Sequence, residues 1–407
     1  MPFGLCAKTF ACWRSIFRTL RSERANTLPT PLCNLHSQPG TICCSCTILS
    51  KSLEVTRERI EIKRLFSHRE KYYNASRSIR TFREDTDWIQ ELERCGISYQ
   101  NGAWRVLSQE HPMCENGLPQ HFVVPKSLTN FEYFKLCESF RCKRAAIWVW
   151  SLGGASLVRM ADLLPDLLKE THTHPNESLM FENIRKCSLQ KTAPRYLELT
   201  KVLPSLQDVQ VSYIKLRALC APVSDRELTE QDEKFLSSLD KTCWLLYVSF
   251  CLKTANEAAG YLKAGDSVVL QENDGRDMCC LISSLVQIFL DPFYRTITGL
   301  QVLIQKEWVA LGHPFSDRMG HVYNKQADKS PVFLLFLDCV WQVLQQFPES
   351  FEFSETFLTT IWDMVFLPIF DTFQFNSEYD RLVAVNEVKK KTYTDRLSAT
   401  GILKYFF

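Results

Sequence analysis

The stretch SVVLQENDGRDMCCLISSLVQIFL, from Ser267 to Leu290, decides the fold of this chain. It starts with a short apolar run, continues through a polar loop that contains Gly275, and ends in a long apolar segment. This order predicts a buried strand, a loop and a helix, with the free amides of the helix N-terminus facing the loop. Such a layout is typical of a phosphate-binding turn.

The loop lacks the residues that phosphate chemistry needs. Cysteine-dependent phosphatases carry C-x5-R here, because a thiolate attacks the phosphate while the arginine binds two of its oxygens. In this chain Glu272 stands at the cysteine position and Met278 at the arginine position. Methionine has no charge and no donor, and the Glu272 carboxylate is expected to occupy the loop amides as an internal anion that repels phosphate. We therefore expect no phosphatase activity from this loop.

The same loop resembles the HCSDGWDRT loop of active myotubularins, a family of phosphoinositide 3-phosphatases. Asp274, Gly275 and Asp277 match that pattern, and the resemblance implies that Asp277 is a surviving general-acid position. Five further positions differ: Gln271 replaces the histidine, Glu272 the nucleophile, Asn273 the serine, Arg276 the tryptophan and Met278 the arginine.

Longer segments carry the resemblance further. Downstream they are RTITGLQVLIQKEWVALGHPF, from Arg295, and SPVFLLFLDCVWQVLQQFPESFEFSETFL, from Ser330. Upstream, WRVLSQEHPMCENGLPQHFVVP, from Trp104, and RCKRAAIWVWSLGGASLVR, from Arg141, look like diverged strands of the family. The resemblance implies an α/β fold, a cysteine-phosphatase-like domain with a mixed central β-sheet flanked by helices.

Within the family, the loop is similar to that of the catalytically inactive branch, which serves as adaptor for active myotubularins. This implies a chain that binds, stabilises or localises an active myotubularin, in the cytoplasm and peripherally on endomembranes such as the sarcoplasmic reticulum. The alternative is a phosphoinositide-binding module or residual phosphatase that uses Arg276, against the expectation that Arg276 pairs with Glu272 or Asp274. Catalysis by Glu272 through an acyl phosphate would need a cationic clamp that the loop does not supply.

Composition sets outer bounds on these interpretations. The 407 residues are 45% hydrophobic and 23% charged, which predicts a globular chain. A formal net charge of +2 favours no nucleic-acid partner and at most a weak phosphoinositide or membrane-surface contact. Most of the 17 cysteines lie in apolar patterns, which predicts reduced thiols in a cytoplasmic protein. No cofactor and no metal site is predicted, and no apolar run reaches the length of a membrane span.

The chain divides into four predicted parts. Residues 1–50 are expected to form a poorly ordered leader, although their basic and aromatic residues would also suit a transit peptide or an amphipathic surface segment. Residues 51–84 read as a charged linker or helix, 85–381 as the phosphatase-like domain and 382–407 as a truncated tail. The family's PH-like module and coiled coil do not fit before Asp85 or in the tail, so we expect a shortened form.

Several other candidates are weaker. Two more C-x5-R matches, at Cys12 and Cys220, have neither a preceding strand nor a glycine in the loop and are interpreted as coincidence. His172 and His174 are expected to be exposed loop residues. Metal-ligand residue types without zinc-site spacing are Cys33, His36, Cys43, Cys44 and Cys46. Helices that face the sheet are predicted from Arg195 to Cys220 and from Leu228 to Gly265, with apolar positions that include Phe235, Leu239, Leu246 and Phe250.

Overall fold

The computed structural model describes residues 79–109, 117–167, 174–220, 234–322, 327–367 and 371–391, the last seven of them as backbone only. The predicted leader, most of the charged linker and the end of the tail lie outside these ranges. So do the zinc-like cysteines between Cys33 and Cys46, the match at Cys12, His172 and Leu228. The predicted domain boundaries stay predictions.

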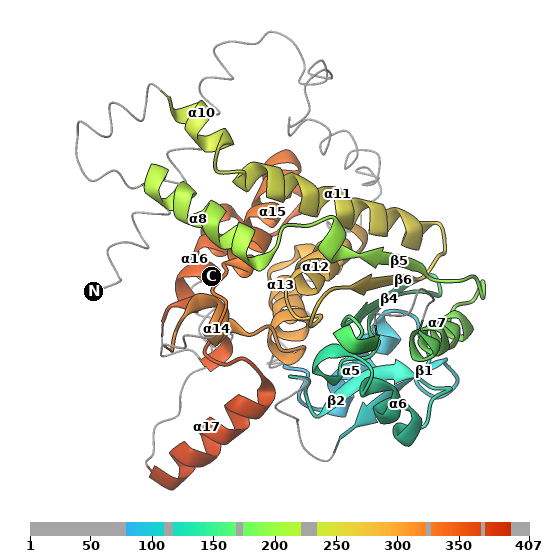
Figure 1. Ribbon diagram of the computed structural model, residues 1–407. Coiled ribbons are helices and arrows are strands. Elements are labelled where there is room, and N and C mark those ends of the chain that lie inside the picture. The colour runs from blue at the N-terminus through green and yellow to red at the C-terminus, as the bar shows by residue number, and fades with distance from the viewer. Residues whose placement is uncertain are drawn as a thin grey trace.

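A four-stranded sheet in the order β3-β4-β6-β5 lies beside the helices (Figure 1). Its strands are β3 (Ile147–Leu152), β4 (Ala155–Met160), β5 (Arg195–Glu198) and β6 (Val268–Gln271). Strand β6 pairs in parallel with β4 and β5, and β3 pairs antiparallel with β4. A second antiparallel pair, β1 (Trp104–Ser108) and β2 (His121–Pro125), packs beside β3. The predicted α/β class with a mixed sheet is confirmed.

Local sequence explains these strands. All four residues of β6 are buried, as expected for an apolar run in the middle of a parallel arrangement. The β3–β4 hairpin turns at Gly153 and Gly154, whose φ angles of +55° and +88° suit a tight turn that glycine adopts without strain. The strands predicted upstream of the loop are therefore present in both of the diverged tracts.

Helices make up most of the remaining structure. In chain order they are α5 (Asp85–Arg94), α6 (Asn130–Cys137), α7 (Pro175–Cys187), α8 (Leu206–Cys220), α10 (Phe235–Asp240), α11 (Trp244–Lys263), α12 (Met278–Leu290), α13 (Ile297–Ile304), α14 (Phe315–Met319), α15 (Val332–Gln346), α16 (Glu355–Val365) and α17 (Glu378–Lys391). Short 3₁₀ turns are η2 (Arg141–Lys143), η3 (Pro165–Leu167), η4 (Leu199–Lys201), η5 (Pro292–Arg295), η7 (Pro348–Ser350) and η8 (Asp371–Phe373), and η6 (Gln305–Ala310) is a π-helix.

The helices build the core outward from the strands. Helices α11 and α12 pack against each other and against β4 and β6, and α15 packs on both of them from the outside (Figure 1). Helix α5 contacts β1, β2 and β3 on another side. Because every described residue of α12 before Leu290 is buried, the loop ahead of α12 is held on a rigid helix.

Two details of the predicted helices are wrong. Arg195–Glu198 forms the edge strand β5 instead of the start of a helix, and the helix begins at Leu206. Phe250 was expected to face the sheet but is 37% exposed. Arg195–Glu198 mixes polar and apolar residues at a half-exposed sheet edge, where pairing with β6 and not helical spacing decides the structure.

Candidate functional site

The loop that joins β6 to α12 runs from Gln271 to Met278, and we call it the degenerate loop. It places the carboxyl group of Glu272 where a phosphate would bind. Glu272 Oε1 accepts a hydrogen bond from the Met278 amide at 2.8 Å, and Oε2 accepts one from the Cys279 amide at 2.7 Å. These amides open α12 and belong to the free donors of its N-terminus. Glu272 is 5% exposed, so the predicted internal carboxyl is present in the predicted place.

Opposing effects act on the pKa of Glu272. Burial, and next the neighbouring Asp277 carboxylate, raise the pKa of Glu272 to about 7, against the opposing effect of the two amide bonds. In the structure its two oxygens occupy both amides. It therefore removes the donors that would cradle a phosphate in this turn.

Asp277, the general-acid position that the resemblance implies, forms an ion pair with a basic partner. Arg318 of α14 donates from Nε and Nη2 to the two Asp277 oxygens, at 2.8 Å each. His313 Nδ1 lies 3.2 Å from Asp277 Oδ1. Burial alone would raise the pKa of Asp277, but Arg318 and His313 lower it far below its usual range. A carboxylate that stays ionised in a bidentate ion pair cannot serve as a proton donor at neutral pH.

Arg276 turns away from the acidic residues of the loop. Its Nε donates to the Gly312 carbonyl oxygen and its Nη2 to that of Asn376, both at 2.6 Å. Asp274 pairs with Arg141 instead, at 3.0 Å. The expected ion pair of Arg276 with Glu272 or Asp274 is therefore wrong, and its guanidinium ties the loop to two distant segments.

The remaining loop positions have structural contacts. Gln271 Nε2 donates to the Ala161 carbonyl oxygen at 3.1 Å, and the Asn273 carbonyl oxygen accepts from the Asp162 amide at 2.8 Å. Gly275 has a φ of +65°, and a Cβ there would lie 3.2 Å from the Met160 carbonyl oxygen, so only glycine fits without strain. Met278 is buried at 4% exposure, as the first residue of α12.

Two buried arginines brace the loop from the sheet side. Arg159 of β4 donates from Nη2 to the Gly275 carbonyl oxygen at 2.8 Å, and its Nη1 forms an ion pair with Glu307 Oε2 at 2.8 Å. Arg144 donates to the Leu311 carbonyl oxygen at 3.1 Å. These guanidinium groups are bound to the protein itself, at carbonyl and carboxylate oxygens.

The cysteines next to the loop are poor nucleophiles. Burial raises the pKa of Cys280 to about 12, and it raises that of Cys279 well above its usual value. Cys280 Sγ donates to the Arg276 carbonyl oxygen at 2.9 Å. The thiols therefore stay protonated at neutral pH.

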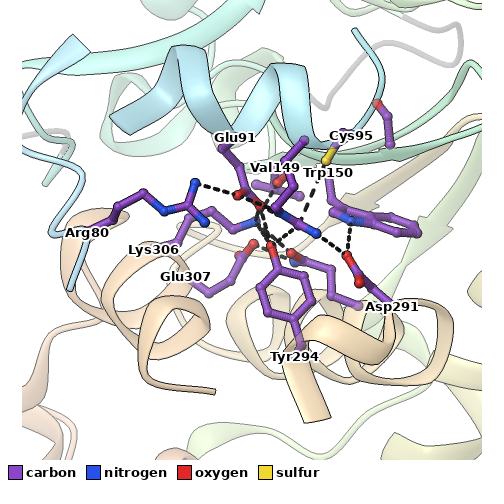
Figure 2. Close-up of polar contacts among 12 residues, drawn as sticks. Arg80, Glu91, Cys95, Val149, Trp150, Asp291, Tyr294, Lys306 and Glu307 are labelled. Atoms are coloured by element: carbon purple, nitrogen blue, oxygen red, sulfur yellow. Dashed lines mark hydrogen bonds and ion pairs between the residues drawn. The ribbon is translucent and has the colours of Figure 1, made fainter. Parts of the chain in front are cut away.

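A buried polar network runs from α5 toward the loop. Lys306 is fully buried, and its Nζ donates to Glu91 Oε1 at 2.9 Å and to Gln287 Oε1 at 2.7 Å. Gln287 Nε2 donates to Glu307 at 2.6 Å, and Glu307 is the ion-pair partner of Arg159. Figure 2 shows Lys306 at the centre of this network, with Glu91, Tyr294 and Glu307 around it.

Sequence reasoning missed Arg318, Arg144, Arg159, Lys306 and Glu307. A signal existed for the last four, since charged residues inside the apolar tracts around Arg159 and Trp308 indicate buried ion pairs. Arg318 gave none, because it lies 41 residues after Asp277, in the short helix α14, and no spacing links the two. His174, expected to be an exposed loop residue, is half-buried and caps α7, where its Nδ1 accepts from the Asn176 amide at 3.3 Å.

The described part of the chain contains neither a candidate metal site nor a candidate membrane span. Within the ranges given above, no group of three or more histidine, cysteine, aspartate or glutamate residues is placed to hold a metal ion. No helix in those ranges is long and apolar enough to cross a membrane.

Comparison with known proteins gives a consistent set of relatives. Residues 191–382 match the family model of the myotubularin-like phosphatase domain. The chain is 42% identical over 316 residues to myotubularin-related protein 10-B of Xenopus laevis, and 42% over 304 residues to myotubularin-related protein 10 of Homo sapiens. It is 38% identical over 313 residues to myotubularin-related protein 12 of Danio rerio.

These alignments are unequal in coverage. Each of the first two covers 74% of this chain but 38% of the relative, and the third covers 74% and 39%. The chain thus spans less than two fifths of the length of the curated relatives that it matches. The matched region includes the whole degenerate loop, from Gln271 to Met278.

Proposed function

Because this chain belongs to the myotubularin family, we propose that it is a non-catalytic member that binds an active myotubularin phosphoinositide 3-phosphatase as an adaptor. The observation that carries this proposal is the position of Glu272, whose two oxygens occupy the amides of Met278 and Cys279. A phosphate cannot take those donors without expelling a buried carboxyl group.

Three losses coincide at the loop. The nucleophile is replaced, the arginine clamp is replaced, and the general-acid position Asp277 is held as an anion by Arg318. Each contribution of this kind is worth several kcal/mol of transition-state stabilisation, on the order of 2.7–4 kcal/mol for one oxyanion donor. Their joint absence supports a role in binding over a role in turnover.

An adaptor keeps the fold of the domain while losing its chemistry. The apolar core and the buried network around Lys306 pack the domain, which supports a well-defined surface for a partner. We propose that this surface engages the partner and that the complex is cytoplasmic, with a peripheral place on endomembranes.

A pull-down tests the proposal. The chain is mixed with a full-length active myotubularin, and both complex formation and turnover of phosphatidylinositol 3-phosphate are measured. A complex whose turnover comes from the partner alone is expected. Turnover by the isolated chain, or the absence of a complex at micromolar concentrations, would contradict the proposal.

The phosphoinositide-binding alternative has a separate test. It depends on Arg276, whose guanidinium already donates to two carbonyl oxygens. In a lipid overlay we expect no binding by the chain and no difference on Arg276→Ala. Binding that weakens on that substitution would favour the alternative.

A further inference from the structure

A group of acidic and aromatic residues lies at the carboxyl ends of β4, β5 and β6, beside the degenerate loop. We call it the acidic edge and define it as Asp162, Glu177, Tyr196, Glu198 and Gln271. Glu198 lies opposite Gln271 in the β5–β6 register, as Met160 does on the β4 side. Since side chains alternate along a strand, Tyr196, Glu198 and Gln271 share one face. Asp162 lies just beyond the end of β4, near enough to Glu198 and Glu177 for their charges to act on it.

Helix α7 supplies the remaining carboxylate. Gln271 Nε2 lies 3.4 Å from Glu177 Oε1, which places Glu177 over the same face. Phe181 of α7 meets the Tyr196 ring edge-on at 5.7 Å and holds it in place. Tyr196 is nevertheless 43% exposed, so one part of its ring is open to a ligand.

The amide of Gln271 is incompletely bonded within this group. Its nitrogen donates to Ala161 and Glu177, but its buried Oε1 accepts no hydrogen bond from the described residues. Gln271 is 2% exposed. The two donor contacts fix the orientation of the amide and leave its oxygen without a donor. A buried acceptor without a donor costs free energy that an incoming N–H would recover.

The charges of the acidic edge are only partly neutralised. Lys201 forms a 2.6 Å ion pair with Glu198 while its own side chain is 74% exposed. No ion pair among the described residues includes Asp162 or Glu177. Burial, and next Glu198, raise the pKa of Asp162 to about 6, as expected where carboxylates crowd together.

We infer that the acidic edge binds a lysine or arginine side chain of a partner polypeptide. The ligand must donate hydrogen bonds to the Gln271 oxygen and to carboxylates, and it must carry positive charge. The open Tyr196 ring suits the aliphatic stem or the cation of such a side chain. Lys201 already shows that an ammonium group fits on Glu198. The inference rests on the proposed function only in taking the partner to be a protein.

This site inverts the preference of a phosphatase. A phosphate-binding pocket needs positive charge at the carboxyl end of its strands, whereas here three carboxylates meet beside the loop. A partner with a basic segment would be attracted to the position from which an anionic lipid is repelled.

Binding of a labelled lysine- and arginine-rich dodecapeptide to the full chain tests the inference by fluorescence anisotropy. Glu177→Gln and Glu198→Gln are each expected to weaken binding about 3–10-fold, and the double variant more than about tenfold, because each removes one partner of a charge pair. The matched control is Glu182→Gln, on the same helix in an exposed pair with Arg185, which should change affinity less than about twofold. Thermal unfolding of each variant verifies its fold.

Several outcomes would overturn the inference. These are no peptide binding by the unaltered chain, equal binding by the edge variants, or binding of spermine as tight as that of the peptide, which would indicate a site for any small cation. The pull-down separates this from the adaptor proposal. If the complex forms even with both edge substitutions, the acidic-edge inference is wrong and the adaptor proposal stands. If the peptide binds at the acidic edge but no complex forms, the inference stands and the adaptor proposal is wrong.

Discussion

Glu272 shows how a single residue changes what a phosphate-binding turn can do. Taking a carboxyl group out of water is unfavourable, but two backbone amides at a helix N-terminus offset much of that cost. The neighbouring Asp277 stays ionised on Arg318, so the loop remains negative whatever the state of Glu272. Two amides at the N-terminus of α12 thus have their hydrogen-bond acceptor within the chain.

The raised pKa of Glu272 predicts a pH dependence. Its folded pKa of about 7 lies above the ordinary 4.5, so the folded state binds more protons in between and its stability falls as pH rises through that window. We expect the difference in unfolding free energy between the unaltered chain and Glu272→Gln to fall by roughly 2–3 kcal/mol from pH 5 to pH 8. Urea denaturation measures it.

The control for that series is Glu257→Gln, the same chemical change at an exposed position of α11. Its difference from the unaltered chain should not vary with pH across the window. A flat difference for Glu272→Gln as well would mean that the carboxyl group is not destabilised by burial.

The ion pair of Asp277 with Arg318 is a second residue-scale feature. Arg318→Met leaves a buried carboxylate with His313 as its remaining partner, and we expect the chain to lose about 3–5 kcal/mol of unfolding free energy. Adding Asp277→Asn should recover part of this loss, because the orphaned charge is removed. Chemical denaturation of the two single variants and the double variant gives the coupling. Additive losses would show that the two groups do not interact.

At the scale of elements, periodicity and turn residues were enough for most of the fold. The strand, loop and helix from Ser267 to Leu290 follow from one apolar run, one glycine and a second apolar run. The hairpin at Gly153 was readable because two glycines interrupt two apolar strands. Strand β5 was not readable, since Arg195–Glu198 is an exposed edge whose polar residues imitate the start of a helix.

The site was predictable in part for the same reason. Local sequence placed Glu272 on the helix amides, because residues of one turn are constrained by that turn. The partners of Asp277 and Arg276 come from segments that fold back onto the loop, and no spacing in the sequence encodes that approach. The pairing expected for Arg276 failed because it assumed the nearest acid.

Packing of α15 against α11 contains a buried carboxyl group that has no ion-pair partner among the described residues. Asp338 accepts from Trp244 Nε1 at 2.6 Å and from Gln342 at 3.3 Å, and burial raises its pKa to about 7 against these bonds. Asp338→Asn keeps an acceptor for Trp244 and removes the cost of ionisation. We expect its effect on the unfolding free energy to be more favourable at pH 8 than at pH 5 by roughly 2–3 kcal/mol.

Urea denaturation at the two pH values checks this, with Asp240→Asn on the exposed end of α10 as control. A greater loss of stability at pH 8 than at pH 5 would mean that the carboxylate itself, and not the acceptor geometry, holds the helices together.

At the scale of the whole molecule, the buried network joins helix α5 to the loop. Contacts pass from Glu91 through Lys306, Gln287 and Glu307 to Arg159, which holds the Gly275 carbonyl oxygen. These residues come from α5, the π-helix η6, α12 and β4, so distant parts of the chain share one set of charges. Figure 2 shows the part of the network around Lys306. The network thus supports the loop from the interior of the fold.

Removing the central charge should weaken that support. Lys306→Met takes the ammonium from Glu91 and Gln287, and we expect a loss of about 3–5 kcal/mol of unfolding free energy. Hydrogen exchange should increase in both α5 and the β6–α12 loop. Lys253→Met, at an exposed position of α11, is the matched control. Faster exchange confined to one of the two regions would show that the network does not couple them.

The central claim is that Glu272 occupies the phosphate site of this loop. Titration of orthovanadate into the full chain and into Glu272→Ala by isothermal calorimetry tests it most directly. We predict no binding by the unaltered chain, and weak millimolar binding by Glu272→Ala, because the amides of Met278 and Cys279 become free while Asp277 still repels the anion. Equal binding by both, or tighter binding by the unaltered chain, would contradict the account.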